Sequence, residues 1–157
     1  MNPTLRLPAL ILGVALTAGL GAPRVAAAQW DFGVRGGVYT DESDAFVGVE
    51  LLHRIGPPQW FFNPNVEWVF LERGDLVTLN ADFHYDLLVD APVDVWVGGG
   101  PAILFNNPDR GDDETDAGLN LLVGVGFLPG DAIRPYVQGK IVLSDETEAV
   151  LAFGVRF

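Results

Sequence analysis

Hydrophobic and polar residues alternate with a period of two along most of the chain after residue 29. Successive side chains of a β-strand point to opposite faces, so this alternation predicts strands with one apolar face and one polar or small face. Short breaks rich in Gly, Pro, Asp and Glu separate the alternating segments, as expected for turns. Eight segments can be traced, at 30–39, 45–54, 60–71, 76–88, 93–105, 117–127, 133–143 and 147–157.

The fourth and the last segments show the alternation most clearly. In the fourth, Val77, Leu79, Ala81, Phe83, Tyr85 and Leu87 oppose Thr78, Asn80, Asp82, His84 and Asp86. In the last, Ala149, Leu151, Phe153, Val155 and Phe157 oppose Glu148, Val150, Ala152, Gly154 and Arg156. After residue 28 no run of 18 apolar residues occurs, so a helical membrane span is excluded. We find no helix-period segment, linker or second domain.

Alternation alone leaves open which face of a closed barrel is outside. A soluble lipocalin-like barrel keeps its apolar residues inside, whereas a transmembrane barrel turns them toward lipid. An eight-stranded barrel has room inside for side chains and little more. The apolar face carries most of the aromatic rings and would overpack that space, while the polar face is rich in glycine. We therefore predict an all-β protein, an eight-stranded antiparallel up-and-down transmembrane β-barrel.

The aromatic residues of the apolar face support this orientation. Counted along alternating strand directions, they fall into two groups, one near each end of the barrel. Rings of this kind are enriched at the two lipid headgroup levels of membrane barrels. The predicted belts contain Trp30, Phe32, Phe62, Tyr85, Phe127 and Phe157 at one end and Trp68, Phe70 and Phe105 at the other.

Residues 1–28 have the features of a secretory signal peptide. Arg6 precedes an apolar run from Leu7 to Leu20, and Val25-Ala-Ala-Ala28 offers a small-residue cleavage site. The apolar run is too short for a membrane anchor of about 20 residues. We predict a signal peptide at 1–28, export to the periplasm and a barrel at 29–157. The chain has no Cys, which excludes a lipoprotein, disulfides and thiolate metal sites.

The charge balance excludes one class of partner. The full chain has 9 basic and 21 acidic residues, and residues 1–28 hold two of the basic ones and no acid. Phosphate contacts need Lys and Arg, so such an acidic barrel is not expected to bind nucleic acid. Half of the residues are nevertheless hydrophobic, so charged and apolar side chains must be segregated.

The signal peptide, the eight strands and the terminal segment Leu151-Ala-Phe-Gly-Val-Arg-Phe157 together resemble the small outer-membrane barrel family that includes the OmpA transmembrane domain and OmpX. The resemblance implies a monomer in the outer membrane, surrounded by lipid and lipopolysaccharide, whose C-terminal strand is recognised by the barrel assembly machinery. It also implies short periplasmic turns near 55–59, 89–92 and 128–132. Outer loops would lie near 40–44, 72–75, 106–116 and 144–146, and 106–116 is the one long loop.

The polar face would then line the lumen with charged residues. Burying them is tolerable when they pair, because an isolated buried ion is costly. We expect a paired network that stiffens the barrel, with a structural or envelope-integrity role; the alternative is a narrow passive pore whose pairs exchange partners. The predicted lumenal charge network consists of Asp31, Arg35, Glu50, Arg54, Glu67, Asp82, His84, Asp86, Asp94, Arg134, Lys140, Glu148 and Arg156.

Catalytic, cofactor and metal sites are not expected. His84 between two carboxylates has the pattern of a base or a metal ligand, but successive inward positions lie ~6.5–7 Å apart, too far for chelation by one strand. Ser43 and Ser144 are assigned to outer loops, away from His84, whereas a Ser–His pair needs hydrogen-bond reach. A lipid A-modifying enzyme and a soluble ligand-binding barrel are therefore less favoured alternatives.

Two further features need a structural answer. The stretch 106–116 carries five acidic residues in a spacing unlike an EF-hand, and we expect a solvated loop, with divalent cations at the lipopolysaccharide surface as an alternative role. Pro64, Pro101 and Pro135 fall on the lipid face of predicted strands, where each removes a ladder hydrogen bond. We expect bulges near the barrel rims at these prolines.

Overall fold

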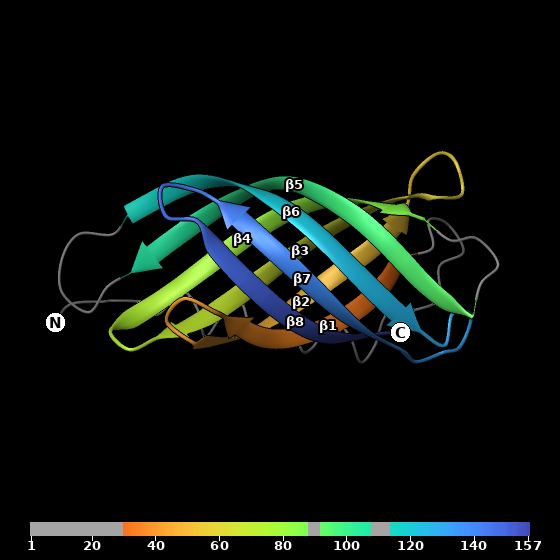
Figure 1. Cartoon of the computed structure of the whole chain (residues 1–157), viewed down its shortest axis with the longest axis horizontal. Helices are drawn as coiled ribbons and strands as arrows, with labels where there is room; N and C mark the ends of the chain where they lie inside the picture. The colour runs from red at the N-terminus through yellow and green to blue at the C-terminus, as the bar shows by residue number, and fades with distance from the viewer. Residues whose placement is uncertain (1–29, 88–91, 108–113) are drawn as a thin grey trace, which may run out of the picture.

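The computed structural model describes residues 30–87, 92–107 and 114–157, which fold into a closed antiparallel barrel (Figure 1). The predicted signal peptide lies outside these residues. Each strand pairs with its neighbours in sequence, and β8 pairs with β1 to close the sheet. The eight-stranded up-and-down barrel is thereby confirmed. The strands are β1 (Trp30–Tyr39), β2 (Asp44–Arg54), β3 (Trp60–Leu71), β4 (Gly74–Asp86), β5 (Val93–Asn107), β6 (Glu114–Phe127), β7 (Arg134–Leu143) and β8 (Glu148–Arg156).

We call the end of the barrel where β1 begins and β8 ends the terminal end, and the opposite one the far end. The described residues contain no helix long and apolar enough to cross a membrane.

The predicted long loop at 106–116 is wrong in its extent. β5 continues to Asn107 and β6 begins at Glu114, so Asn106 pairs with Glu114 and Leu104 with Asp116. The ladder continues because strand pairing satisfies the backbone groups, while acidic side chains at strand ends remain in water. Residues 108–113, and with them three of the five acids, lie outside the described part of the chain.

The prolines do not produce the bulges that we expected. On both sides of Pro64 the register between β2 and β3 is the same, since Glu50 pairs with Asn65 and His53 with Phe62. A bulge would add one residue to one strand and shift this register. Pro64 therefore sits within a continuous strand pair and simply leaves a local gap in the ladder.

Pro101 behaves in the same way between β4 and β5. Asn80 pairs with Ala102 and Phe83 with Gly99, so the register again continues unchanged across the proline. Pro135 lies at the second position of β7. Both mid-strand prolines are tolerated without an extra residue.

A side chain replaces the donor that Pro64 lacks. In the register of β2 and β3, Leu51 lies opposite Pro64. The side-chain amide of Asn63 donates to the carbonyl oxygen of Leu51 at 2.7 Å. A buried carbonyl without a donor is costly, so this contact explains how an interior strand accepts proline.

Apolar side chains cover the outside of the barrel and polar ones the inside. Every strand contributes at least one large hydrophobic residue that is exposed on the outer surface. The charged residues near mid-barrel are instead buried, as for Glu50, Glu67 and Lys140. The expectation that the apolar face is outside is confirmed. Exposed examples, one from each strand in order, are Val38, Val47, Phe70, Leu79, Ile103, Leu121, Ile141 and Leu151.

The lumen is not filled by charge along its whole length, which corrects the expected picture. Toward the far end it is closed by a cluster of buried apolar side chains, which we call the apolar seal. Both faces of these strand ends are hydrophobic, as in Val69-Phe70 and Val142-Leu143. One face meets the outside and the other packs across the lumen. The seal consists of Tyr39, Phe46, Val69, Leu76, Ala102, Leu104, Val142, Val150 and Ala152.

Candidate functional site in the barrel lumen

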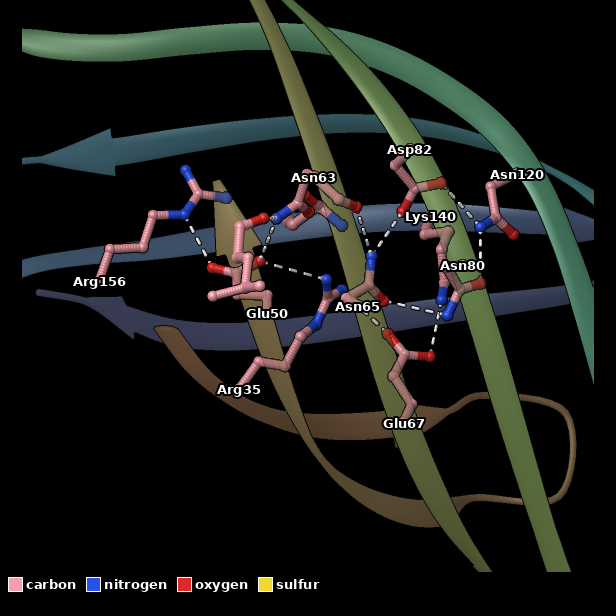
Figure 2. Close-up of polar contacts among 12 residues, drawn as sticks. Arg35, Glu50, Asn63, Asn65, Glu67, Asn80, Asp82, Asn120, Lys140 and Arg156 are labelled. Carbon is pink, nitrogen blue, oxygen red and sulfur yellow. Dashed lines mark hydrogen bonds and ion pairs between the residues drawn. The ribbon is translucent and has the colours of Figure 1, made fainter. Parts of the chain in front are cut away.

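A chain of buried ion pairs crosses the lumen (Figure 2). Arg156 Nε lies 2.7 Å from Glu50 Oε1, and Arg35 Nη1 lies 3.6 Å from Glu50 Oε2. Arg35 Nη2 is 3.1 Å from Glu67 Oε1, and Lys140 Nζ is 2.7 Å from Glu67 Oε2. Three cations thus alternate with two carboxylates. We call these residues, with Asp82 and the amides around it, the lumenal network.

Barrel closure brings these charges together from distant parts of the sequence. Arg35 lies on β1, Glu50 on β2 and Glu67 on β3, whereas Lys140 and Arg156 lie on β7 and β8. Because β8 pairs with β1, strands from both ends of the chain face the same lumen. Each charged residue occupies an inward position of its strand, and all five are buried.

The carboxylate of Asp82 is held by amides. Asn65 donates to Asp82 Oδ2 at 2.9 Å and Asn120 donates to Asp82 Oδ1 at 2.8 Å. Asn120 also donates to Asn80, and Asn80 donates to Asn65, so the three amides form a connected frame. Hydrogen bonds to a charged acceptor offset part of the cost of burying it. With Asp82 included, three carboxylates balance three cations, and the network is neutral as a whole.

The lumenal network and the apolar seal are joined at Glu67. The Tyr39 hydroxyl donates to Glu67 Oε2 at 2.7 Å, and the Thr78 hydroxyl donates to the same oxygen at 3.3 Å. The Tyr39 ring belongs to the seal and packs edge-on against Phe46. Tyr39 therefore marks the boundary between the apolar and the polar parts of the lumen.

On the other side of the network, at the terminal end, lies a cavity of about 290 Å³, which we call the vestibule. Arg134 Nη2 pairs with Asp31 Oδ2 at 2.7 Å at its rim. Arg54 lies with its guanidinium 5.4 Å from the centre of the Phe61 ring. The lining residues are Asp31, Leu52, Arg54, Phe61, His84, Asp86, Asp94, Trp96, Gly126, Pro129, Gly130, Arg134, Pro135, Tyr136 and Arg156.

Aromatic and cationic side chains stack at the boundary between the vestibule and the network. The His84 and Trp96 rings are nearly parallel, at 10°, with centroids 5.7 Å apart. The Arg156 guanidinium carbon lies 4.9 Å from the centre of the Trp96 ring and 4.3 Å from that of the Tyr136 ring. Trp96 Nε1 donates to Gln138 Oε1 at 3.2 Å. These contacts hold the imidazole and the guanidinium in fixed orientations.

No metal centre emerges around His84 within the described ranges, since no three His, Cys, Asp or Glu side chains gather there as ligands. Ser43 and Ser144 lie in turns at the far end, whereas His84 lines the vestibule at the terminal end. The described residues thus separate the hydroxyls and the imidazole that a Ser–His pair would need.

The structure divides the predicted lumenal residues among three locations. Arg35, Glu50, Glu67, Asp82, Lys140 and Arg156 lie in the network. Asp31, Arg54, His84, Asp86, Asp94 and Arg134 line the vestibule, as Arg156 also does. Glu148 lies apart from both, at the first position of β8 near the far end.

Several lumenal residues were missed because they carry no charge. The amides, the Thr78 hydroxyl and the rings of Trp96 and Tyr136 all occupy inward positions of their strands, so the period-two pattern was the signal that could have found them. The missed residues are Tyr39, Asn63, Asn65, Thr78, Asn80, Trp96, Asn120, Tyr136 and Gln138.

The predicted belt residues all lie on the outer surface, and neighbouring rings make contact. Trp68 and Phe70 stack with centroids 5.8 Å apart, and Phe32 and Phe157 with centroids 6.4 Å apart. Trp60, which was not predicted, is exposed at the terminal end. Trp30, Phe70, Phe105, Phe127 and Phe157 are exposed, while Phe32, Phe62, Trp68 and Tyr85 are half-buried.

No protein-family model and no curated protein matches the chain. Among solved structures it is similar to neisserial surface protein A, with 17% identity, a TM-score of 0.66 and coverage of 83% of this chain and 97% of that chain. The N-terminal β-barrel domain of OprF from Pseudomonas aeruginosa has 15% identity, a TM-score of 0.65 and coverage of 83% and 98%. Ail, the attachment invasion locus protein of Yersinia pestis, has 13% identity, a TM-score of 0.53 and coverage of 83% and 97%. All three are small eight-stranded outer-membrane barrels, so the predicted resemblance is confirmed for the fold.

Proposed function

We propose that the chain is a bacterial outer-membrane protein that spans the lipid as a closed, non-conducting barrel with a structural or envelope-integrity role. The observation that carries this proposal is the exposed apolar surface contributed by all eight strands. In water such a continuous surface would drive association, whereas in lipid it is the expected exterior. Aromatic rings near both ends of the barrel support the same assignment.

In this proposal the terminal end faces the periplasm and the far end faces outward. The orientation follows the outer-membrane barrel fold, in which the chain ends lie on the periplasmic side. The C-terminal strand would be the segment recognised during assembly, with Phe157 in the periplasmic belt. Lipid and lipopolysaccharide are the proposed surroundings, and the barrel is proposed to act as a monomer.

Two features of the lumen support a non-conducting barrel. Apart from the Tyr39 hydroxyl, which is bonded to Glu67, the side chains of the apolar seal offer no polar groups that could replace the hydration shell of an ion. Beside it, the side chains of Arg35, Glu50, Glu67 and Lys140 are fully buried and form ion pairs with one another. To pass through the lumen, an ion would therefore have to break a buried ion pair and also cross the apolar seal.

A narrow passive pore is the second candidate, because the alternating charges of the network provide partners that could exchange. Recordings of single-channel current in planar bilayers separate the two functions. Under our proposal the protein gives no openings above the empty-bilayer background. Discrete openings whose conductance changes in a Lys140→Met variant that is shown to be folded by heat-modifiable gel migration would instead establish the pore.

A catalytic role is not part of the proposal. The separation of Ser43 and Ser144 from His84 along the barrel argues against a serine-dependent enzyme acting on lipid A. Mass spectrometry of lipid A from overexpressing cells tests this point, and loss or gain of an acyl chain would contradict it.

Membrane fractionation together with gel migration tests the location and the fold. We expect the protein in the outer-membrane fraction, with faster migration of the unheated sample in detergent gels because the barrel stays folded. A soluble periplasmic product with no mobility shift would overturn the proposal.

A further inference from the structure

The vestibule contains two carboxylates that have no ion pair within 4 Å and no side-chain hydrogen bond among the described residues, although Arg54 and Arg156 act on Asp86 from a greater distance. Asp86 is the last residue of β4, and Asp94 is the second residue of β5. Both line the same cavity of about 290 Å³. Neither forms an ion pair or a hydrogen bond with any other side chain in the described ranges. Two carboxylates in one half-enclosed cavity repel each other, and a bound cation would relieve that repulsion.

Two of the three cations that line the vestibule are paired with other carboxylates. Arg134 pairs with Asp31 at 2.7 Å, and Arg156 pairs with Glu50 at 2.7 Å. Arg54 is exposed and lies over the Phe61 ring. With Arg156 counted in the network, the vestibule keeps three carboxylates, of Asp31, Asp86 and Asp94, against the two guanidinium groups of Arg54 and Arg134, which is a net charge of −1.

A buried nitrogen provides a second, independent sign of a ligand. His84 is 1% exposed and lines the vestibule, two residues before Asp86 on the same inward face of β4. Its Nε2 atom has no hydrogen-bond partner among the residues that the structure describes. A neutral imidazole with its proton on Nδ1 accepts a hydrogen bond at Nε2, and a buried acceptor without a donor is costly.

From this arrangement we propose that the vestibule is a binding site for an alkylammonium group, held by Asp86, Asp94 and His84. An ammonium group donates up to three hydrogen bonds and, unlike a metal ion, does not need all of its partners at about 2 Å from one point. The alkyl chain would lie against Leu52 and Phe61, which supply apolar lining.

A divalent metal fits this site less well. Mg²⁺ requires near-octahedral oxygen ligands at about 2.0–2.1 Å, and Ca²⁺ takes six to eight oxygens. The described His, Asp and Glu side chains do not gather into any group of three at such distances. An N–H···O hydrogen bond has a donor–acceptor distance of about 2.7–3.2 Å, so an ammonium group does not need ligands as close as a metal ion does.

Titration calorimetry on the protein purified from membranes in detergent tests the site, with cadaverine and the peptide Gly-Lys-Gly as probes. Cadaverine represents a free amine, and the peptide represents a lysine side chain of another protein. We expect saturable binding of one equivalent for at least one probe, and the tighter probe identifies the source. Absence of saturable binding for both probes overturns the proposal.

Variants and a competing ion locate the site. Asp86→Asn/Asp94→Asn should weaken binding by about tenfold or more, because two charge-assisted hydrogen bonds are lost. The matched control Asp145→Asn/Glu146→Gln removes two acids in the turn between β7 and β8 at the far end and should leave affinity unchanged. Equal weakening in both variants, or equally tight binding of Mg²⁺, would show non-specific attraction and overturn the proposal.

Heat-modifiable gel migration verifies that each variant is folded. If the double variant does not fold, two other measurements test the site. One is the affinity of the single variant Asp94→Asn, and the other is the shift of the Trp96 indole N–H NMR resonance in the wild type on adding cadaverine. Unchanged affinity in Asp94→Asn with no shift of that resonance on adding cadaverine counts against the site. Binding in detergent is independent of where the protein resides, so its failure leaves the outer-membrane proposal standing.

Discussion

Removing the charge of Glu67 should destabilise the barrel strongly, because this carboxylate is the most heavily bonded group in the lumen. It accepts hydrogen bonds from Lys140 at 2.7 Å and from the Tyr39 hydroxyl at 2.7 Å, and it forms an ion pair with Arg35 at 3.1 Å. Its side chain is 0% exposed, as are those of Arg35 and Lys140. Glu67→Gln keeps the shape and leaves three cations facing two carboxylates in the network. Breaking a buried pair in this way costs about 3–5 kcal/mol.

A double-mutant cycle attributes this loss to the ion pair. Lys140→Met alone should also destabilise, because it leaves the Glu67 carboxylate with a single cation. In Glu67→Gln/Lys140→Met the network is again neutral, with two cations and two carboxylates. The double variant should therefore be more stable than the sum of the two single effects predicts, by about 1–3 kcal/mol.

The assay is equilibrium unfolding in urea in the presence of lipid vesicles, followed by tryptophan fluorescence and by the fraction of heat-modifiable protein. Asp31→Asn is the matched control, because Arg134 and Asp31 are also 2.7 Å apart but their side chains are 24% and 33% exposed. An ion pair that solvent reaches contributes about 0–1 kcal/mol, and this pair is partly exposed. If Glu67→Gln lost no more free energy of unfolding than Asp31→Asn, the ion chain would not hold the barrel together. Strict additivity in the cycle would show that Glu67 and Lys140 act independently.

Three further predictions concern single positions, and the same unfolding assay measures the first two. Asn63→Ala should lower the free energy of unfolding by about 1–3 kcal/mol, because it removes the donor to the carbonyl opposite the proline of β3. Gly124→Ala should cost about 1–3 kcal/mol, since its Cβ would overlap a buried indole ring, whereas Gly139→Ala meets nothing within 4 Å and should be neutral; equal effects would disprove the packing argument. Val123→Arg, on the exposed face of β6, should reduce stability in lipid by about 2–4 kcal/mol while Val123→Leu should not, and an unaffected arginine variant would argue against lipid at this surface.

The strands could be predicted because each residue of a membrane barrel meets either the exterior or the lumen. Side chains therefore alternate between two environments along each strand. This period of two can be recognised in the sequence without knowing which strands are neighbours. The segment 60–71 was predicted with the bounds that β3 has in the structure. The pattern failed at β6, where Glu114 and Asp116 extend the strand beyond the apolar band. Charged residues such as Glu114 and Asp116 indicate where the lipid-facing surface would end. They do not indicate where the strand ends, because a strand pair can continue beyond the lipid.

The partners inside the lumen could not be predicted, because they depend on register and closure. Arg156 and Glu50 are separated by 106 residues, and Lys140 and Glu67 by 73. The local sequence pattern does not indicate which two of the many inward charges lie at the same height along the barrel axis. The asparagine residues of the network were not predicted for another reason. Asparagine carries no charge, so the sequence does not show that these side chains donate hydrogen bonds to Asp82.

The apolar seal was not predicted, because its strand segments lack the contrast between an apolar and a polar face on which the prediction relied. At Val69-Phe70 and Leu104-Phe105 both faces of the strand are hydrophobic, so the period of two disappears just where the lumen closes. Loss of alternation at a strand end is thus itself a signal of a plugged lumen.

The order of the three lumenal layers determines how the polar interior can be reached. The seal packs across the far end, the lumenal network lies next to it, and the vestibule opens at the terminal end. Tyr39 binds the network from the seal side, and Arg156 contributes to both the network and the vestibule. Solvent or a ligand therefore reaches the ion chain through Arg156, the member that already lies at the vestibule wall. A cation bound near Asp86 would act on the network through that guanidinium, whereas a change at the far-end turns would first have to disturb the seal.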